Sequence, residues 1–243
     1  MVAYARGAFL EDLGTSIPQI TVQDFLTFLA PPQPAFDLNG TMQWLNNAGI
    51  IVLDRWSAID KDPTDQPTVE NDTFSHLVDI FTKVVDAIIA NSELPETPIV
   101  QLLQNTNKPL ESTTIANATK PDGYLALKQR PHEDQVRWDD VVLSCEYKKK
   151  LGPITEYNVS IRRGFEMCCT KLPSHQDIGK CLWSMQHIMR DDPCRRATFG
   201  MTIENMTTRL WFCCRSSVIV TDAFNFITVR IFFVYHMKFE KLT

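Results

Sequence analysis

Apolar residues recur every three or four positions from Phe74 to Ile89, and the run stops at Asn91. This spacing predicts an amphipathic helix over residues 73–90 with one buried face. Shorter helical patterns precede it at residues 22–29 and 41–47, and turn-rich segments separate the three. The first half of the chain is therefore expected to be mainly helix and loop.

The period then changes from helical to alternating. Residues 124–127 and 139–147 read as two β-strands joined by a polar segment. A second long helix is expected to begin near Ser174 and to bury the face that runs from Ile178 to Met189. Three further strands are expected over residues 197–204, 207–214 and 218–221.

This order of elements predicts an α/β (α+β) fold, in which a central mixed sheet is flanked by helices. We expect residues 71–228 to form that domain. An N-terminal helical and loop segment would occupy residues 1–70, and a divergent tail would occupy residues 229–243.

Composition narrows the class of protein. Of the 243 residues, 44% are hydrophobic and 22% are charged, which excludes collagen, a coiled coil and wholesale disorder. The net charge of −5 argues against a generic polyanion binder. The charge is uneven, however, because residues 1–118 carry a net −10 and residues 119–243 a net +5. Any contact with phosphate is expected in the second half.

Nothing in the sequence predicts secretion or a membrane span. The chain opens without a basic stretch followed by an apolar run. The longest apolar stretch, residues 224–239, is interrupted by Asn225, Arg230 and His236. The seven cysteines form no Cys-x-x-Cys pair, so most are expected to be reduced thiols in the core. We therefore expect an intracellular protein, in cytoplasm or nucleus, with no membrane partner.

Candidate chemistry centres on Asp122, Glu146 and Lys148. Side chains alternate along a strand, so Glu146 and Lys148 should project from one face, and Asp122 begins the neighbouring strand. Two carboxylates can bind Mg²⁺, and an ammonium beside them can orient a metal-bound water. Asp122 and Glu146 are thus candidate metal ligands, and all three are candidate catalytic residues of a phosphodiester hydrolase. The alternative is an exposed strand pair beside a turn residue.

This arrangement resembles the PD-(D/E)xK restriction-endonuclease-like superfamily, in which Pro-Asp precedes Glu-x-Lys across a hairpin between two helices. The resemblance implies a restriction-endonuclease-like core for the sheet. One position departs from the pattern. Some nucleases of the superfamily carry Gln-x-x-x-Tyr on the downstream helix, whereas here Gln176 is followed by Lys180. That departure weakens the case for an active nuclease.

A second resemblance covers roughly residues 70–226. The run Arg195-Arg-Ala-Thr-Phe-Gly-Met-Thr202, then Arg209-Leu-Trp211 and Phe224-Asn-Phe226, resembles the region upstream of the catalytic domain in fungal-type protein kinases. Trp138-Asp-Asp-Val141 with Glu146-x-Lys148 fits the same pattern. The resemblance implies a kinase domain as partner of this region.

The sequence itself holds no kinase motifs. None of its nine glycines forms a Gly-x-Gly pair, and Val-Ala-Ile-Lys and Asp-Phe-Gly are absent. We therefore expect that the chain is not a protein kinase by itself. The expected function is a non-catalytic or regulatory N-terminal module, a truncated product of a fungal-type kinase gene, with the kinase domain or another protein as partner.

Two alternatives stay open. One is a metal-dependent nuclease that uses Mg²⁺ at Asp122 and Glu146. The other is a nucleic-acid-binding domain with a degenerate nuclease site, in which basic side chains after the second strand contact phosphates. The candidates for such contacts are Lys149, Lys150, Arg162 and Arg163.

Overall fold

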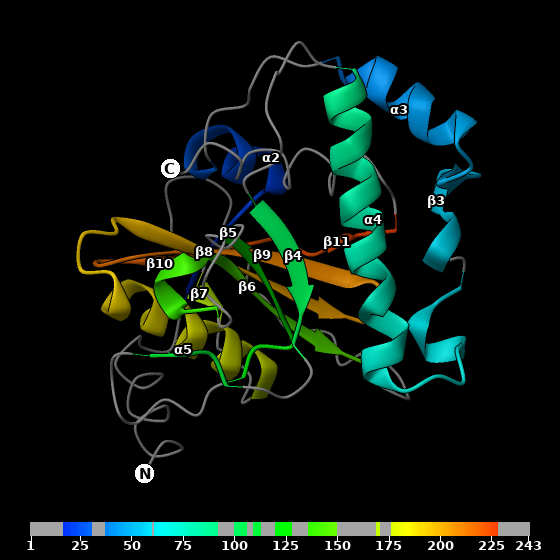
Figure 1. Ribbon diagram of the computed structural model, residues 1–243. Coiled ribbons are helices and arrows are strands. Elements are labelled where there is room, and N and C mark those ends of the chain that lie inside the picture. The colour runs from blue at the N-terminus through cyan, green and yellow to red at the C-terminus, as the bar shows by residue number, and fades with distance from the viewer. Residues whose placement is uncertain are drawn as a thin grey trace.

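A mixed β-sheet forms the centre of the molecule, with α4 (Glu70–Ala90) and α5 (Gln176–Asp191) on its opposite faces (Figure 1). The fold is therefore α/β, as predicted. The computed structural model describes residues 17–30, 37–59, 61–91, 100–105, 109–112, 120–127, 136–149, 169–170 and 176–227. None of the helices in these ranges is long and apolar enough to cross a bilayer.

The sheet has nine strands among the described residues. In spatial order, eight of them are β4 (Val100–Gln104), β5 (Gly123–Leu127), β6 (Val141–Lys148), β8 (Ala197–Glu204), β9 (Thr207–Cys214), β10 (Val218–Thr221), β1 (Ile17–Ile20) and β7 (Cys169–Thr170). The ninth, β11 (Phe224–Asn225), pairs with β9.

Pairing follows the predicted hairpin. β5 and β6 are antiparallel, with Leu125 opposite Leu143, so the two strands lie in one sheet as expected. β6 and β8 are parallel, and α5 lies on the chain between them. A parallel pair needs a crossover of this kind, because a tight turn would make the two strands antiparallel. The position of α5 therefore follows from the β6–β8 pairing.

Several smaller elements complete the N-terminal half. They are α2 (Val22–Asp24), the π-helical turn η1 (Phe25–Leu29), α3 (Leu38–Asn47), the hairpin of β2 (Ile51–Val52) and β3 (Arg55–Trp56), and the 3₁₀ turns η2 (Ser57–Ile59) and η3 (Pro63–Asp65). A further 3₁₀ turn, η4 (Trp138–Asp140), leads into β6. The helical patterns at residues 22–29 and 41–47 are thus confirmed in type, although the first is split into two kinds of helix.

Several details differ from the sequence prediction, and among them is the start of β6, which begins at Val141 because Trp138–Asp140 forms a 3₁₀ turn. α4 begins at Glu70, three residues earlier than expected, with Val69 as its N-cap. β4 lies in a stretch rich in Pro, Asn and Thr that predicted a loop, and β1 was also not predicted as a strand. β4 nonetheless pairs with β5 along its whole length, because cross-strand contacts supply what its composition does not.

Each face of the sheet carries its own core. On the α4 side, Phe74 stacks on Tyr147 of β6 with ring centroids 5.2 Å apart. On the α5 side, Ile178 and Leu182 pack with Trp211 of β9. A Cβ at Gly200 of β8 would lie 2.6 Å from Cys181 Sγ, so a glycine is needed for α5 to lie this close to the sheet. Three of the described cysteines, Cys145, Cys181 and Cys213, are buried free thiols.

A histidine is buried on this second face. His187 of α5 is 4% exposed and lies between Trp138 and Trp183, with ring centroids 5.8 and 4.9 Å away. Neither of its ring nitrogens has a hydrogen-bond partner among the described residues. Burial lowers the pKa of His187 from 6.5 to about 4; Asp191 opposes the shift and Arg190 adds to it. The ring is therefore neutral in the folded protein near neutral pH.

We expect acid to destabilise the fold through His187. Its folded pKa lies below its unfolded value, so its contribution is complete above pH 6.5 and is lost as the pH falls toward about 4. Between about pH 7 and pH 5 this amounts to roughly 1–2 kcal/mol. Urea unfolding of the wild type and of His187→Gln at both pH values measures the difference. The exposed His76→Gln is the control, and an equal pH response in wild type and His187→Gln would contradict the assignment.

Candidate functional site

Asp122 and Glu146 lie together at the end of the β5–β6 hairpin. Asp122 immediately precedes β5, and the pairing of Gly123 with Cys145 brings it beside the end of β6. Its Oδ2 accepts a hydrogen bond of 2.9 Å from the backbone N–H of Tyr147. The Asp122 carboxylate is thereby fixed across the hairpin, next to Glu146. This is the convergence of carboxylates that the sequence predicted.

The ammonium beside these carboxylates belongs to Lys180 of α5. Its Nζ lies 3.4 Å from Glu146 Oε2 and 3.8 Å from Asp122 Oδ1. The Glu146 side chain is fully buried, while those of Asp122 and Lys180 are 22% and 27% exposed. We refer to Asp122, Glu146 and Lys180 as the charged triad. It joins the first turns of α5 to the hairpin.

The electrostatics of the charged triad centre on Glu146. Burial raises the pKa of Glu146 well above its ordinary value, and the neighbouring Asp122 raises it further. The Lys180 ammonium acts in the opposite direction and lowers that pKa, but it does not outweigh burial. Burial and Asp122 thus favour the neutral acid of Glu146, whereas Lys180 favours its carboxylate.

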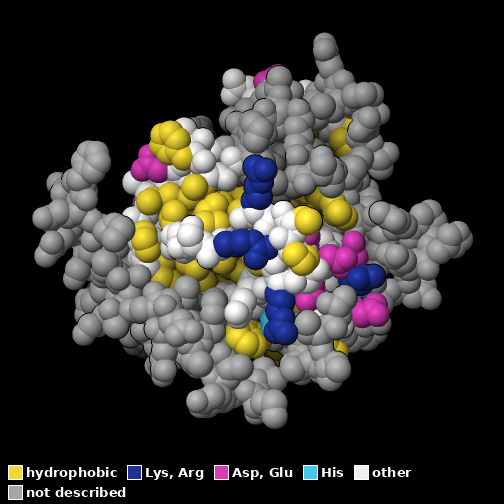
Figure 2. All heavy atoms as spheres, turned by 90° about the vertical axis from the view of Figure 1, so that its left-hand side faces the viewer, with side chains coloured by type: hydrophobic (Ala, Val, Ile, Leu, Met, Phe, Trp, Pro, Cys, Tyr) yellow, Lys and Arg dark blue, Asp and Glu magenta, His cyan; other side chains and the backbone are white. Residues whose placement is uncertain are grey.

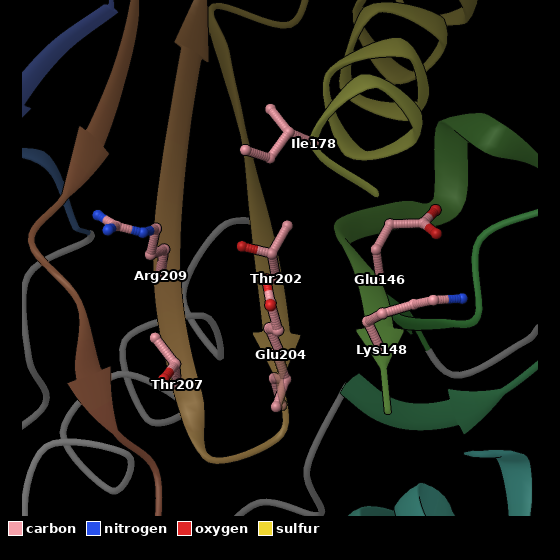
Figure 3. Close-up of a pocket in the computed structure, with 8 residues that line it drawn as sticks. Glu146, Lys148, Ile178, Thr202, Glu204, Thr207 and Arg209 are labelled. Carbon is pink, nitrogen blue, oxygen red and sulfur yellow. The ribbon is translucent and has the colours of Figure 1, made fainter. Parts of the chain in front are cut away.

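Lys148 does not complete the site as predicted. It projects from the same face of β6 as Glu146 (Figure 3), but its Nζ lies 3.5 Å from Glu70 Oε2, at the start of α4. The same Glu70 oxygen accepts a 2.8 Å hydrogen bond from the backbone N–H of Lys149. Lys148 therefore pairs with α4 at the end of the strand, and Lys180 is the cation beside Glu146.

The predicted phosphate contacts differ in their outcome. The Lys149 ammonium donates hydrogen bonds to the backbone carbonyls of Gln66 and Thr68. It therefore holds the segment before α4 and is used within the protein. Lys150, Arg162 and Arg163 lie outside the residues that the structure describes.

A shallow pocket lies beside the charged triad on the α5 face of the sheet. It is lined by Glu146 and Lys148 of β6, Ile178 of α5, and Thr202, Glu204, Thr207 and Arg209 of the β8–β9 hairpin (Figure 3). Glu146 and Lys148 point to one side of it, and Arg209 points to the other. Arg209 donates to the carbonyl of Thr221 at 3.0 Å. The charged groups thus surround the pocket without meeting at one point.

The charged triad is poorly suited to a divalent cation. Mg²⁺ prefers several oxygen ligands in octahedral geometry, and the protein supplies two carboxylates here. Burial raises the pKa of one of them, Glu146, so a proton would compete with a metal for that carboxylate. Among the described residues, no group of three or more His, Cys, Asp or Glu side chains could hold a metal.

Comparisons with known proteins give no assignment. No protein-family model matches the sequence, and no curated protein and no solved structure matches it either.

Sequence reasoning missed the roles of Lys180 and Glu70. Lys180 was visible only as a departure from a nuclease pattern, and its place over Glu146 depends on the crossover of α5. Glu70 was assigned to a loop because α4 was expected to begin at residue 73. Acidic residues are favoured in the first turn of a helix, so Glu70 and Asp72 could have indicated that α4 begins near residue 70.

We expect Glu146→Gln to stabilise the protein as the pH rises. The raised pKa means that Glu146 favours folding at acid pH, and that this advantage is lost above its unfolded pKa. Glutamine has the shape of the neutral acid and does not titrate. Relative to wild type, the variant should therefore gain stability between about pH 5 and pH 8, because only the wild type must either keep a proton on Glu146 or bury its charge.

Urea unfolding at both pH values measures this gain. The exposed Asp72→Asn on α4 is the charge-matched control and should follow the wild type. A stability difference between Glu146→Gln and wild type that stays constant with pH would show that Glu146 is ionised in the fold.

Proposed function

We propose that this chain is a non-catalytic module that resembles the N-terminal region of fungal-type protein kinases, and that it acts on a kinase domain or another protein partner. The observation that carries the proposal is the Lys180 ammonium, 3.4 and 3.8 Å from the two carboxylates. It takes the place that a divalent cation would need in a working nuclease site. The charged triad therefore supports structure rather than hydrolysis.

Burial supports the same conclusion. A metal ligand in a hydrolase must be open to the cation and a general base to the proton that it removes, whereas the Glu146 side chain is fully buried. Lys148, the other residue of the Glu-x-Lys pair, is held by Glu70. The charged triad therefore serves to link α5 to the β5–β6 hairpin. This is consistent with a nuclease-like core that no longer catalyses hydrolysis.

The kinase-like motifs fall on structural positions. Arg195 donates to the backbone carbonyls of Asp139 and Val141 and pairs with Asp192 at 3.2 Å, so it ties β8 to the start of β6. Gly200 permits the close approach of α5, and Trp211 is buried beneath that helix. These residues of the kinase-like motif thus stabilise the fold. This supports a module recognised by its surface rather than by a reactive centre.

The proposal is tested by adding the purified chain to the catalytic domain of a fungal-type protein kinase. We expect association with a Kd of about 10 µM or tighter by calorimetry, and a changed rate of substrate phosphorylation. The catalytic domain of a protein kinase from another family is the control. Absence of binding at about ten times that concentration, or equal binding to both domains, would contradict a kinase-specific module.

The second candidate is a metal-dependent nuclease, favoured by the convergence of two carboxylates and an ammonium at one point. In that case Asp122 and Glu146 would hold Mg²⁺, which would activate a water for attack on the phosphodiester. Lys180, in place of Lys148, would orient that water. The degenerate nucleic-acid-binding domain has less support, because the Lys149 ammonium is used within the protein.

Cleavage assays separate these readings. With Mg²⁺ or Mn²⁺ the wild-type chain is expected to leave labelled single-stranded DNA, double-stranded DNA and RNA intact. If it cleaves any of them, and if Glu146→Gln and Lys180→Gln each reduce the rate by about a hundredfold or more while Lys148→Gln does not, the nuclease reading replaces the module. The exposed Lys83→Gln on α4 controls for general loss of positive charge.

A further inference from the structure

Three exposed arginines gather at the end of the sheet where α5 finishes. Arg190 lies in the last turn of α5, Arg196 directly precedes β8, and Arg215 directly follows β9. Ala197 pairs with Cys214, so Arg196 and Arg215 are the next positions outward from that pair. Figure 2 views this end of the molecule and shows Lys and Arg side chains in a row beside apolar surface. We call these three residues the arginine cluster.

The arginine cluster lacks internal neutralisation. Nearby arginines are paired, since Arg137 lies 3.1 Å from Asp139 and Arg195 lies 3.2 Å from Asp192. By contrast, Arg190 and Arg196 form no ion pair with any residue that the structure describes, and Arg215 donates to the backbone carbonyl of Pro193. Like charges held close together disfavour one another unless an anion lies between them.

A groove runs through the arginine cluster. Arg190 and Arg215 line it together with Met189, Pro193 and the buried Cys213, which give it an apolar floor. Gln186 of α5 also lines the groove, and its Oε1 is buried without a hydrogen-bond donor among the described residues.

We propose that the arginine cluster and its groove bind a phosphorylated segment of a partner protein. Guanidinium groups bind phosphate oxygens in a bidentate manner, which suits a single phosphate between Arg190 and Arg215. The apolar floor of the groove would contact a neighbouring side chain of the segment. Arginine clusters recognise phosphorylated motifs in this way. The inference stands apart from the charged triad.

A peptide fits this end better than a nucleic acid does. Nucleic acids need a long basic track and aromatic platforms for bases, and none of the exposed large hydrophobic side chains among the described residues lies here. Acidic side chains also flank the row of cations (Figure 2), and Asp191 and Asp192 directly follow Arg190. They would disfavour a long polyanion more strongly than a short segment that carries one phosphate.

The experiment measures fluorescence anisotropy with two labelled peptide pools. Both pools are degenerate around one fixed position, which is phosphothreonine in the first and threonine in the second. We expect the full chain to bind the phosphorylated pool at least tenfold more tightly. The double variant Arg190→Gln with Arg215→Gln should lose at least tenfold of this affinity. The matched control, Arg55→Gln with Lys83→Gln, removes two exposed charges elsewhere and should bind as wild type does.

Circular dichroism checks that the double variant is folded, because Arg215 also contacts Pro193. Arg196→Gln alone, which removes no described contact, gives an independent second reading and should weaken binding by several-fold. Equal affinity for the two pools, or full binding by the folded double variant, would overturn the proposal. So would tighter, arginine-dependent binding of labelled single-stranded DNA or RNA, which would assign the surface to nucleic acid. Phosphopeptide binding without kinase-domain binding would refute the proposed function alone.

Discussion

The parallel pairing of β6 with β8 is the constraint on which the rest of this structure depends. Because the chain must cross over the sheet between these strands, α5 lies against one face of it. That crossover puts Lys180 over the hairpin and leaves Arg190 at the opposite end of the helix. The charged triad and the arginine cluster are therefore products of a single topological step, although neither is evident from local sequence.

The charged triad is better understood as a device for specificity than as a source of stability. Removing charges from water costs several kcal/mol per ion, and their attraction inside the protein recovers this only in part. The raised pKa of Glu146 is one result of that imbalance. A fully buried acid also disfavours any arrangement in which α5 is displaced, because Glu146 would then lose the Lys180 ammonium. The charged triad thus ties the position of α5 to the β5–β6 hairpin, at a modest cost in stability.

Sequence patterns predicted much of this fold. The last three predicted strands match β8, β9 and β10 residue for residue, because their alternation is bounded by clear turns. The buried face of α4 followed from its spacing in the same way. β1 was missed because it becomes a strand only by pairing with β10, far along the chain, and β4 was missed because it lies in a stretch rich in Pro, Asn and Thr. The site was half predicted: Asp122 and Glu146 share a hairpin, whereas the cation is Lys180, contributed by a tertiary contact.

Gly200 lets α5 lie close to the sheet, and this has a consequence for both ends of the helix. Lys180 and Arg190 are ten residues apart on one rigid element, a separation of about 15 Å along its axis. If a ligand at Arg190 shifted this helix, the contacts of Lys180 would change as well, because both side chains belong to one rigid element. Thermodynamic linkage would make this effect reciprocal. If protonation of Glu146 changed the affinity of a ligand for Arg190, binding of that ligand would change the proton affinity of Glu146 by the same factor.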